Sequence, residues 1–145
     1  MATPDAVDTA VRALTRRDRS ETDVRRILAR KGVPEAEVAA ALEVLRRIGA
    51  LDDSRFATRS AEALAARGLG DAAILFRLER EGVDPGLAVD AVAALEPECD
   101  RAAALAETRG ASAKTARWLA GRGFAPESVE SSVRRIAERD LPELG

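Results

Sequence analysis

The sequence predicts an all-α protein built from three tandem three-helix repeats that form an elongated, curved helical array. Two observations support this prediction. A turn of glycine, apolar residue and proline occurs three times, and four columns of large aliphatic residues keep the same spacing from each of those glycines. In addition, the sequence lacks the strict apolar–polar alternation that is typical of a half-buried strand.

Three glycine turns divide the chain into similar units. Each of Gly32, Gly82 and Gly123 ends an amphipathic stretch, an apolar residue comes next, and a proline lies within three residues. A glycine just past a helix end and a proline at the start of the following helix are the usual signals at these positions. Each turn is therefore predicted to join the second and third helices of one repeat.

The aliphatic columns lie 18 and 4 residues before each glycine and 10 and 13 residues after it. The last two columns have the i, i+3 spacing of residues that share one helix face. We therefore expect every repeat to bury equivalent residues in a core of its own. In column order they are Leu14, Leu64 and Leu105; Leu28, Leu78 and Leu119; Leu42, Val92 and Val133; and Leu45, Leu95 and Ile136.

The helices follow from this pattern in order. Ser20 and Ser112 are the predicted N-caps of two of them, and Asp52 or Asp53 is the predicted cap of a third, with Leu51 packing beneath it. The predicted helices are 5–17, 21–31 and 35–48 in a repeat of residues 1–50; 53–67, 71–81 and 85–95 in a repeat of residues 51–96; and 98–109, 112–122 and 126–139 in a repeat of residues 97–140.

Composition argues against catalysis. The chain has no His, no Tyr and one cysteine, Cys99, so it lacks the commonest general base, an internal disulfide and a cysteine zinc cluster. No phosphate-binding loop motif occurs. Asp52 and Asp53, which in principle suit a hard cation, are better explained as helix caps. We therefore expect no enzymatic activity, no cofactor and no metal site.

The sequence also bears on location and assembly. The start of the chain, residues 1–5, is polar and unlike a secretory leader, and no apolar run approaches the roughly 18 residues that span a bilayer. The single cysteine fits a reducing compartment. We expect a cytoplasmic monomer that binds no membrane.

Basic residues are concentrated near the N-terminus, although the formal net charge is −2. This cluster is interpreted as a patch for phosphates or for an acidic protein surface, and a solvated helix face is the alternative. A second cluster extends from the end of the first repeat into the second repeat and also includes Arg67; ion pairs with Asp52, Glu43 and Glu62 are its alternative interpretation. The candidate partner- or DNA-binding residues are Arg16, Arg17, Arg19, Arg25, Arg26, Arg30 and Lys31 in the first cluster, and Arg46, Arg47, Arg55 and Arg59 in the second.

Two further features have competing interpretations. The Gly32 turn resembles a helix-turn-helix connection, but Glu35 and Glu37 at the start of the next helix would repel phosphates and argue against base readout. Trp118 precedes a packed leucine, so it is interpreted as a residue of the third core or its edge, with an interface hot spot as the alternative.

The stretch from Leu51 to Ala57, Leu-Asp-Asp-Ser-Arg-Phe-Ala, resembles the signature of the RecX family, L-D-D-x-x-[FY]-A. Three other stretches resemble further elements of that family in the same order: 67–70, 78–83 and 117–124. The resemblance covers residues 10–138. The motif residues carried over are Leu51, Asp52, Asp53, Phe56, Gly68 and Gly70.

The resemblance implies a regulator, mainly inhibitory, of the RecA recombinase in DNA repair and the SOS response. Family members bind the RecA filament on single-stranded DNA and depress its ATP hydrolysis, strand exchange and coprotease activity; some also contact DNA. This chain departs from the family's basic pattern after Gly70, where Asp71 stands, and before Gly82, where Glu81 stands. We therefore expect any phosphate contact at the N-terminal basic cluster.

Two other functions stay open. A nucleic-acid-binding module that acts without RecA would bind single strands tightly with a steep salt dependence, and the net charge of −2 argues against it. A generic helical-repeat adaptor would leave the partner unnamed.

Overall fold

The computed structural model describes residues 4–141, which form nine α-helices and no strand. The predicted helices are all present, and their ends lie within two residues of the prediction. The helices are α1 (Pro4–Arg16), α2 (Glu21–Arg30), α3 (Glu35–Arg47), α4 (Asp53–Ala66), α5 (Asp71–Arg80), α6 (Pro85–Ala93), α7 (Glu98–Arg109), α8 (Ala113–Gly121) and α9 (Pro126–Arg139).

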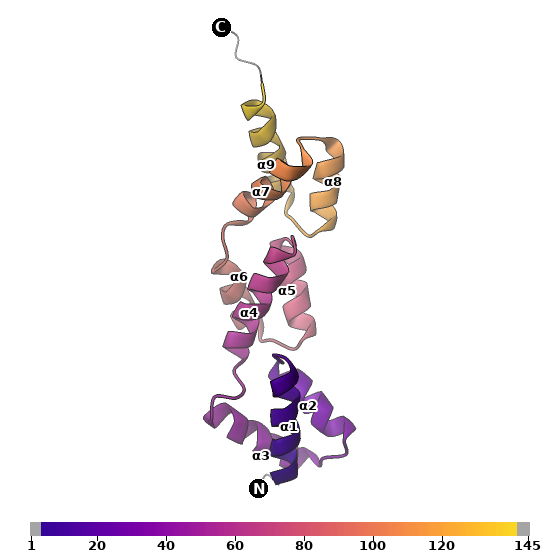
Figure 1. Cartoon of the computed structure of the whole chain (residues 1–145), viewed down its shortest axis with the longest axis vertical. Coiled ribbons are helices and arrows are strands. Elements are labelled where there is room, and N and C mark those ends of the chain that lie inside the picture. The colour runs from indigo at the N-terminus through magenta and orange to yellow at the C-terminus, as the bar shows by residue number, and fades with distance from the viewer. Residues whose placement is uncertain (1–3, 142–145) are drawn as a thin grey trace.

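The helices form three groups that follow one another along the long axis of the molecule, with α1 in the group at one end and α9 in the group at the other (Figure 1). We call these groups repeat 1 (α1–α3), repeat 2 (α4–α6) and repeat 3 (α7–α9). The middle helices α2, α5 and α8 succeed one another along one side, the right-hand side of Figure 1. The elongated all-α fold predicted from the sequence is thus confirmed.

Each repeat has its own hydrophobic core. Leu28, Leu78 and Leu119, the column four residues before each glycine, are at most 1% exposed. The half-buried column of Leu14, Leu64 and Leu105 packs against the first, second and third core respectively. Equivalent positions in the sequence therefore have equivalent surroundings. The boundaries 1–50, 51–96 and 97–140 stay a prediction.

Backbone geometry explains the three glycine turns. Gly32, Gly82 and Gly123 have φ angles of 81°, 80° and 92°, in the left-handed region that residues with a side chain rarely adopt. The N–H of the apolar residue after each glycine donates to the carbonyl of the buried leucine in the preceding helix, at 3.1–3.2 Å. This is the hydrogen bond of a Schellman helix end. It reverses the chain so that the third helix packs back on the first.

The predicted caps are observed. The Ser20 and Ser112 hydroxyls accept from backbone N–H groups in the first turns of α2 and α8, at 3.1 and 3.2 Å. Of the two adjacent carboxylates, Asp52 is the one that caps α4, accepting from the Arg55 N–H at 3.0 Å. Such caps satisfy N–H groups that have no partner inside the helix.

Repeats 1 and 2 meet where the end of α5 lies against the start of α2. The Ser20 hydroxyl donates to the Glu81 carbonyl at 2.6 Å, and the Thr22 hydroxyl donates to the Gly82 carbonyl at 3.4 Å. The negative end of one helix thereby faces the positive end of the other, which is a favourable arrangement of helix dipoles. We call this set of contacts, with those of Asp53 described next, the first junction.

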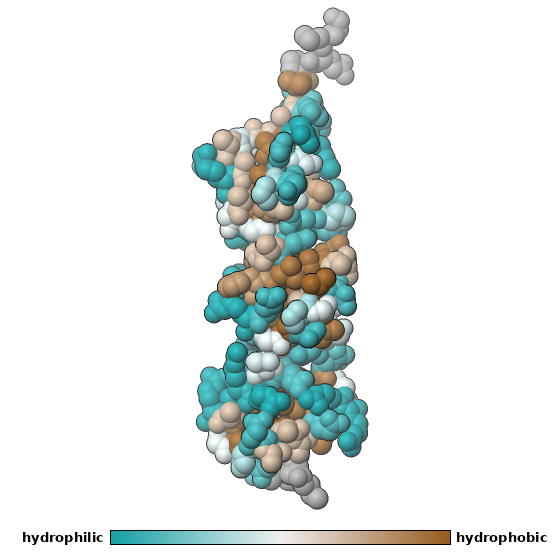
Figure 2. All heavy atoms as spheres, turned by 180° about the vertical axis from the view of Figure 1, so that it is seen from behind, coloured by the Kyte–Doolittle hydropathy of each residue, from teal (hydrophilic) through white to brown (hydrophobic). Residues whose placement is uncertain are grey.

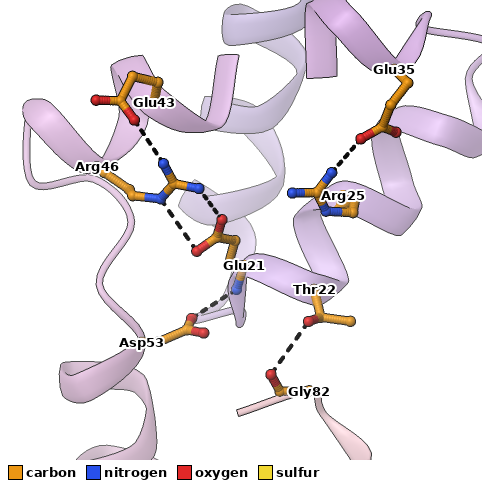
Figure 3. A network of polar contacts seen from close by, with 8 residues as sticks. All are labelled: Glu21, Thr22, Arg25, Glu35, Glu43, Arg46, Asp53 and Gly82. Atoms are coloured by element: carbon orange, nitrogen blue, oxygen red, sulfur yellow. Dashed lines mark hydrogen bonds and ion pairs between the residues drawn. The ribbon is translucent and has the colours of Figure 1, made fainter. Parts of the chain in front are cut away.

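Asp53 completes the first junction (Figure 3). Its carboxylate accepts a hydrogen bond from the backbone N–H of Glu21, the first residue of α2, at 2.8 Å. The Glu21 side chain is held in turn by Arg46 of α3, which also donates to Glu43 at 2.8 Å. Partial burial, reinforced by the neighbouring Glu21 and Asp52 carboxylates, raises the pKa of Asp53, while the Glu21 N–H and Arg46 oppose the shift.

Repeats 2 and 3 meet through a second junction with the same plan. The N–H of Gly70, which precedes α5, donates to the carbonyl of Arg122 at the end of α8, at 2.9 Å. Gly70 has no space for a side chain, because a methyl group there would overlap the backbone of Gly123 and Phe124. Glu98, the first residue of α7, corresponds to Asp53 in the first junction: it accepts from the N–H of Asp71 at 2.7 Å.

Two arginines of repeat 3 strengthen the second junction. The side chain of Arg101 is only 10% exposed; it donates to the Asp71 carboxylate at 2.7 Å and to the Leu69 carbonyl at 2.9 Å. Arg122 donates to the carbonyls of Arg67, at 2.6 Å, and Gly68, at 3.3 Å. Three consecutive carbonyls at the end of α4 are therefore held by side chains of the next repeat.

Candidate binding surface

Exposed cations without an ion pair to another residue of 4–141 gather at the ends of α1 and α4 and along the middle helices. We call this surface the cationic edge. It extends over all three repeats, because α2, α5 and α8 follow one another along one side (Figure 1). Its residues are Arg16, Arg26, Arg30, Lys31, Arg67, Arg77, Arg80, Lys114 and Arg117.

A groove of about 400 Å³ between α1 and α2 forms the N-terminal end of the cationic edge. Arg16, Arg30 and Lys31 line it and are free to bind, whereas Arg12 is paired with Asp8 at 3.0 Å. Five positive side chains, with Arg19 as the fifth, line this one hollow and attract an anion strongly, because their electrostatic potentials add. This groove contains the core of the basic cluster predicted from the sequence.

A second groove, of about 420 Å³, lies between repeats 1 and 2. Arg17, Arg59, Arg67 and Arg77 line its walls, and apolar side chains that include Phe56 form part of its floor. A smaller groove of about 190 Å³ continues from it between α5 and α8, sharing two of these arginines. The hollows therefore connect the cations of repeat 1 with those of repeats 2 and 3.

Aromatic rings accompany the cations in repeats 2 and 3. Phe76 of α5 is 59% exposed and has the Arg80 guanidinium 5.8 Å from its ring centroid. Half-buried Trp118 packs against the third core and lies between Arg109, at 3.4 Å, and Arg122, at 5.6 Å. Trp118 is thus a residue of the core edge, as predicted, and it also fixes two arginines at the surface.

The third helix of each repeat carries acidic side chains without an ion pair within residues 4–141: Glu37 on α3, Asp90 on α6, and Glu127 and Glu138 on α9. Seen from behind, the molecule also has apolar side chains gathered over repeat 2 (Figure 2). The arginines of α9 are paired with carboxylates, including Arg135 with Asp100 at 3.6 Å. Acidic side chains without an ion pair to a described residue also lie on α4, at Glu62, and on α5, at Glu79, so positive and negative charge are only partly separated across the width of the molecule.

Several of the predicted binding residues hold the structure together. Arg19 is 14% exposed at its side chain and bonds the Ala13 carbonyl and Asp23. The others with partners are Arg17 with Asp23, Arg25 with Glu35, Arg46 and Arg47 with Glu43, Arg55 with the Gly49 carbonyl, and Arg59 with Asp18. Arg16, Arg26, Arg30 and Lys31 remain as exposed cations without such pairs.

The motif residues lie in the cores and junctions. Leu51 is buried in the core of repeat 1 and Phe56 in that of repeat 2. Gly68 has a φ angle of 85°, and Gly70 is packed against the next repeat. The stretch that resembles a family signature is thus the segment that links neighbouring repeats.

Arg77, Arg80, Lys114 and Arg117 of the cationic edge were not among the predicted binding residues, whereas Arg67 belonged to the second predicted cluster. The repeat register contained a signal for the missing cations, because Arg26 and Arg117 both lie six residues before their glycine, and Arg30 and Arg80 both lie two residues before theirs. Cations at equal distances from the glycine turns are expected on equivalent faces of the repeats, as the aliphatic residues are.

Among residues 4–141, no group of three His, Cys, Asp or Glu side chains is arranged to hold a metal ion. No helix in this part of the chain has the length and apolar character needed to cross a membrane.

Comparison with known proteins decides the family. Residues 6–45 match the family model described as RecX, first three-helix domain. The chain is 31% identical to Regulatory protein RecX of Chromohalobacter salexigens over 149 aligned residues, which cover 95% of this chain and 98% of that protein. This chain belongs to the RecX family. Regulatory protein RecX of Halorhodospira halophila is 30% identical, with 92% of this chain and 89% of that protein covered.

Solved structures agree on the fold. The crystal structure of RecX from Lactobacillus salivarius superposes with a TM-score of 0.82 and 16% identity, covering 92% of this chain and 96% of that one. A second crystal structure, of regulatory protein RecX, superposes with a TM-score of 0.77 and 22% identity, covering 92% of this chain and 72% of that one. The relatives of this RecX protein are thus named as regulators, and two of them share its array of helices.

Proposed function

We propose that this RecX protein binds the RecA filament on single-stranded DNA through its cationic edge and lowers the filament's ATPase, strand-exchange and coprotease activities. The observation that supports the proposal is the row of unpaired cations along α2, α5 and α8. A row that extends over three repeats fits a long anionic surface better than a small ligand, because no one groove collects all its charges.

The proposed mechanism is a shift between filament states. A ligand changes such an equilibrium only by the difference between its affinities for the states. An elongated protein that contacts neighbouring RecA protomers through several repeats binds best to the state whose spacing matches its own. Binding therefore favours that state over those required for ATP hydrolysis and strand exchange.

Charge reversal on the two sides of the molecule tests this proposal. Arg30→Glu with Arg77→Glu changes the cationic edge, and Arg134→Glu with Arg135→Glu makes the same charge change on α9. RecA ATPase on single-stranded DNA is followed against protein concentration. Compared with the wild type, we expect the variant of the cationic edge to require at least about tenfold more protein for half-inhibition. The α9 variant should require less than about threefold more. Equal effects of the two pairs, with unchanged helicity, would contradict the proposal.

Direct binding of single-stranded nucleic acid is the second candidate, and exposed Phe76 beside Arg77 and Arg80 favours it, since bases stack on aromatic rings. Fluorescence anisotropy with a labelled oligonucleotide in the absence of RecA distinguishes the two. Tight binding with a steep salt dependence, together with loss of RecA inhibition when free DNA is in excess, would favour this candidate.

A further inference from the structure

The two junctions between repeats are held by different kinds of contact. In the second junction, backbone packs on backbone at Gly70, and Arg101 and Arg122 hold three consecutive carbonyls. In the first junction, the hydroxyls of Ser20 and Thr22 and the carboxylate of Asp53 make hydrogen bonds, and Arg59 pairs with Asp18 at 3.3 Å. At least one side chain therefore lies in each of these contacts.

The two junctions also differ at the surface and in their apolar contacts. The groove between repeats 1 and 2 measures about 420 Å³, and that between α5 and α8 about 190 Å³. Leu105 of repeat 3 lies against Gly68 of repeat 2, so apolar contact extends across the second junction. Relative motion is the normal behaviour of units whose interface is small and polar.

The chain between repeats 1 and 2 suits a pivot. Leu51 is anchored in the core of repeat 1, while Phe56 is anchored in that of repeat 2. The Asp52 N-cap has extended backbone, with φ −154° and ψ 100°. A hinge needs only a few residues at the end of an element that absorb a change in backbone angles. Residues 51–53 are such a segment.

We propose that repeats 2 and 3 form one rigid arm and that repeat 1 pivots on it about residues 51–53, with the Ser20–Glu81 and Glu21–Asp53 hydrogen bonds as its latch. Opening the latch turns the N-terminal groove of the cationic edge relative to Arg77 and Arg80. If the proposed function holds, this motion adapts the spacing of the cations to the filament, but the pivot itself does not depend on RecA.

Distances between spin labels test the pivot in the isolated protein. Labels are attached to new cysteines at exposed positions after Cys99→Ser. The pair Ala39→Cys and Ala93→Cys crosses the first junction, and the pair Ala93→Cys and Ala120→Cys crosses the second. We expect the first distance distribution to be at least about twice as wide as the second. Equal widths, or a wider second distribution, would overturn the proposal.

Variants of the latch make the test specific. Ser20→Ala with Asp53→Ala should widen the first distribution and leave the second unchanged, since neither residue contacts repeat 3. Gly70→Ala is the matched variant, and it should widen only the second distribution. Circular dichroism checks that helicity is retained. A latch variant that retains full helicity and leaves the first distribution unchanged would show that these two hydrogen bonds do not restrain repeat 1.

Discussion

The first and second junctions join homologous surfaces in different ways. Both place the end of one middle helix against the start of another, and both use an acidic residue at the start of the next repeat, Asp53 or Glu98, to cap that helix. The first junction relies on side chains that can rotate away, and the second on backbone contact and a nearly buried Arg101. The same repeat architecture thus combines a firm contact with a weaker one.

Arg101→Ala should have the largest effect on stability. The substitution removes the side chain that donates hydrogen bonds to the Asp71 carboxylate and to the Leu69 carbonyl. Loss of such a nearly buried charged group lowers the free energy of unfolding by about 3 kcal/mol. Arg46→Ala, near the first junction, serves for comparison. Because the Arg46 side chain is 44% exposed, we expect this variant to lose less than about 1 kcal/mol of the free energy of unfolding. Urea unfolding measures both, and equal losses would remove the distinction between the junctions.

Gly70→Ala should rank second. Its φ of −82° suits any residue, so the cost comes from the overlap with the backbone of Gly123 and Phe124, and overpacking of this kind costs about 2 kcal/mol. The control is Gly121→Ala, at the end of α8, where a methyl group meets open space. We expect that control to change the free energy of unfolding by less than about 1 kcal/mol.

The junctions also show which features of this protein the sequence can predict and which it cannot. The helices and cores were predictable because glycine turns and aliphatic columns are local or periodic signals. The partner of Asp53 was not predictable, because Asp52 and Asp53 are equally suited by sequence to cap α4. The role of Arg101 was invisible because its partners belong to the preceding repeat. The candidate cations in residues 12–31 were found by density, but which of them are unpaired depends on neighbours from other helices.

Gly82→Ala offers a third comparison, because its neighbour is a side chain. A methyl group at Gly82 would overlap Thr22, and the φ of 80° adds strain of about 1 kcal/mol. Thr22→Ala removes most of the overlapping atoms, so the double variant should be more stable than the sum of the single effects predicts. Thermal unfolding of the four proteins measures this coupling. If the effects of the two substitutions on stability simply add, repeat 1 can move away from Gly82 without any loss of stability.

Asp53 gives the smallest effect and the only one that depends on pH. Its pKa is raised in the folded protein, chiefly by burial, so the folded chain holds a proton that the unfolded chain releases. The stability that Asp53 contributes is therefore complete below its ordinary pKa and declines as pH rises through the raised value. Asp53→Asn keeps an oxygen that accepts from the Glu21 N–H but cannot ionise.

Urea midpoints of the wild type and Asp53→Asn are compared from about pH 3 to about pH 7, the range that spans carboxyl titration. We expect the wild type to lose stability relative to the variant as pH rises, because desolvation of the ionised carboxylate weakens the first junction. The opposite trend would mean that the helix dipoles of α2 and α4 stabilise the carboxylate by more than its burial costs. In that case the first junction would be held most firmly at neutral pH, and the contrast with the second would be smaller there.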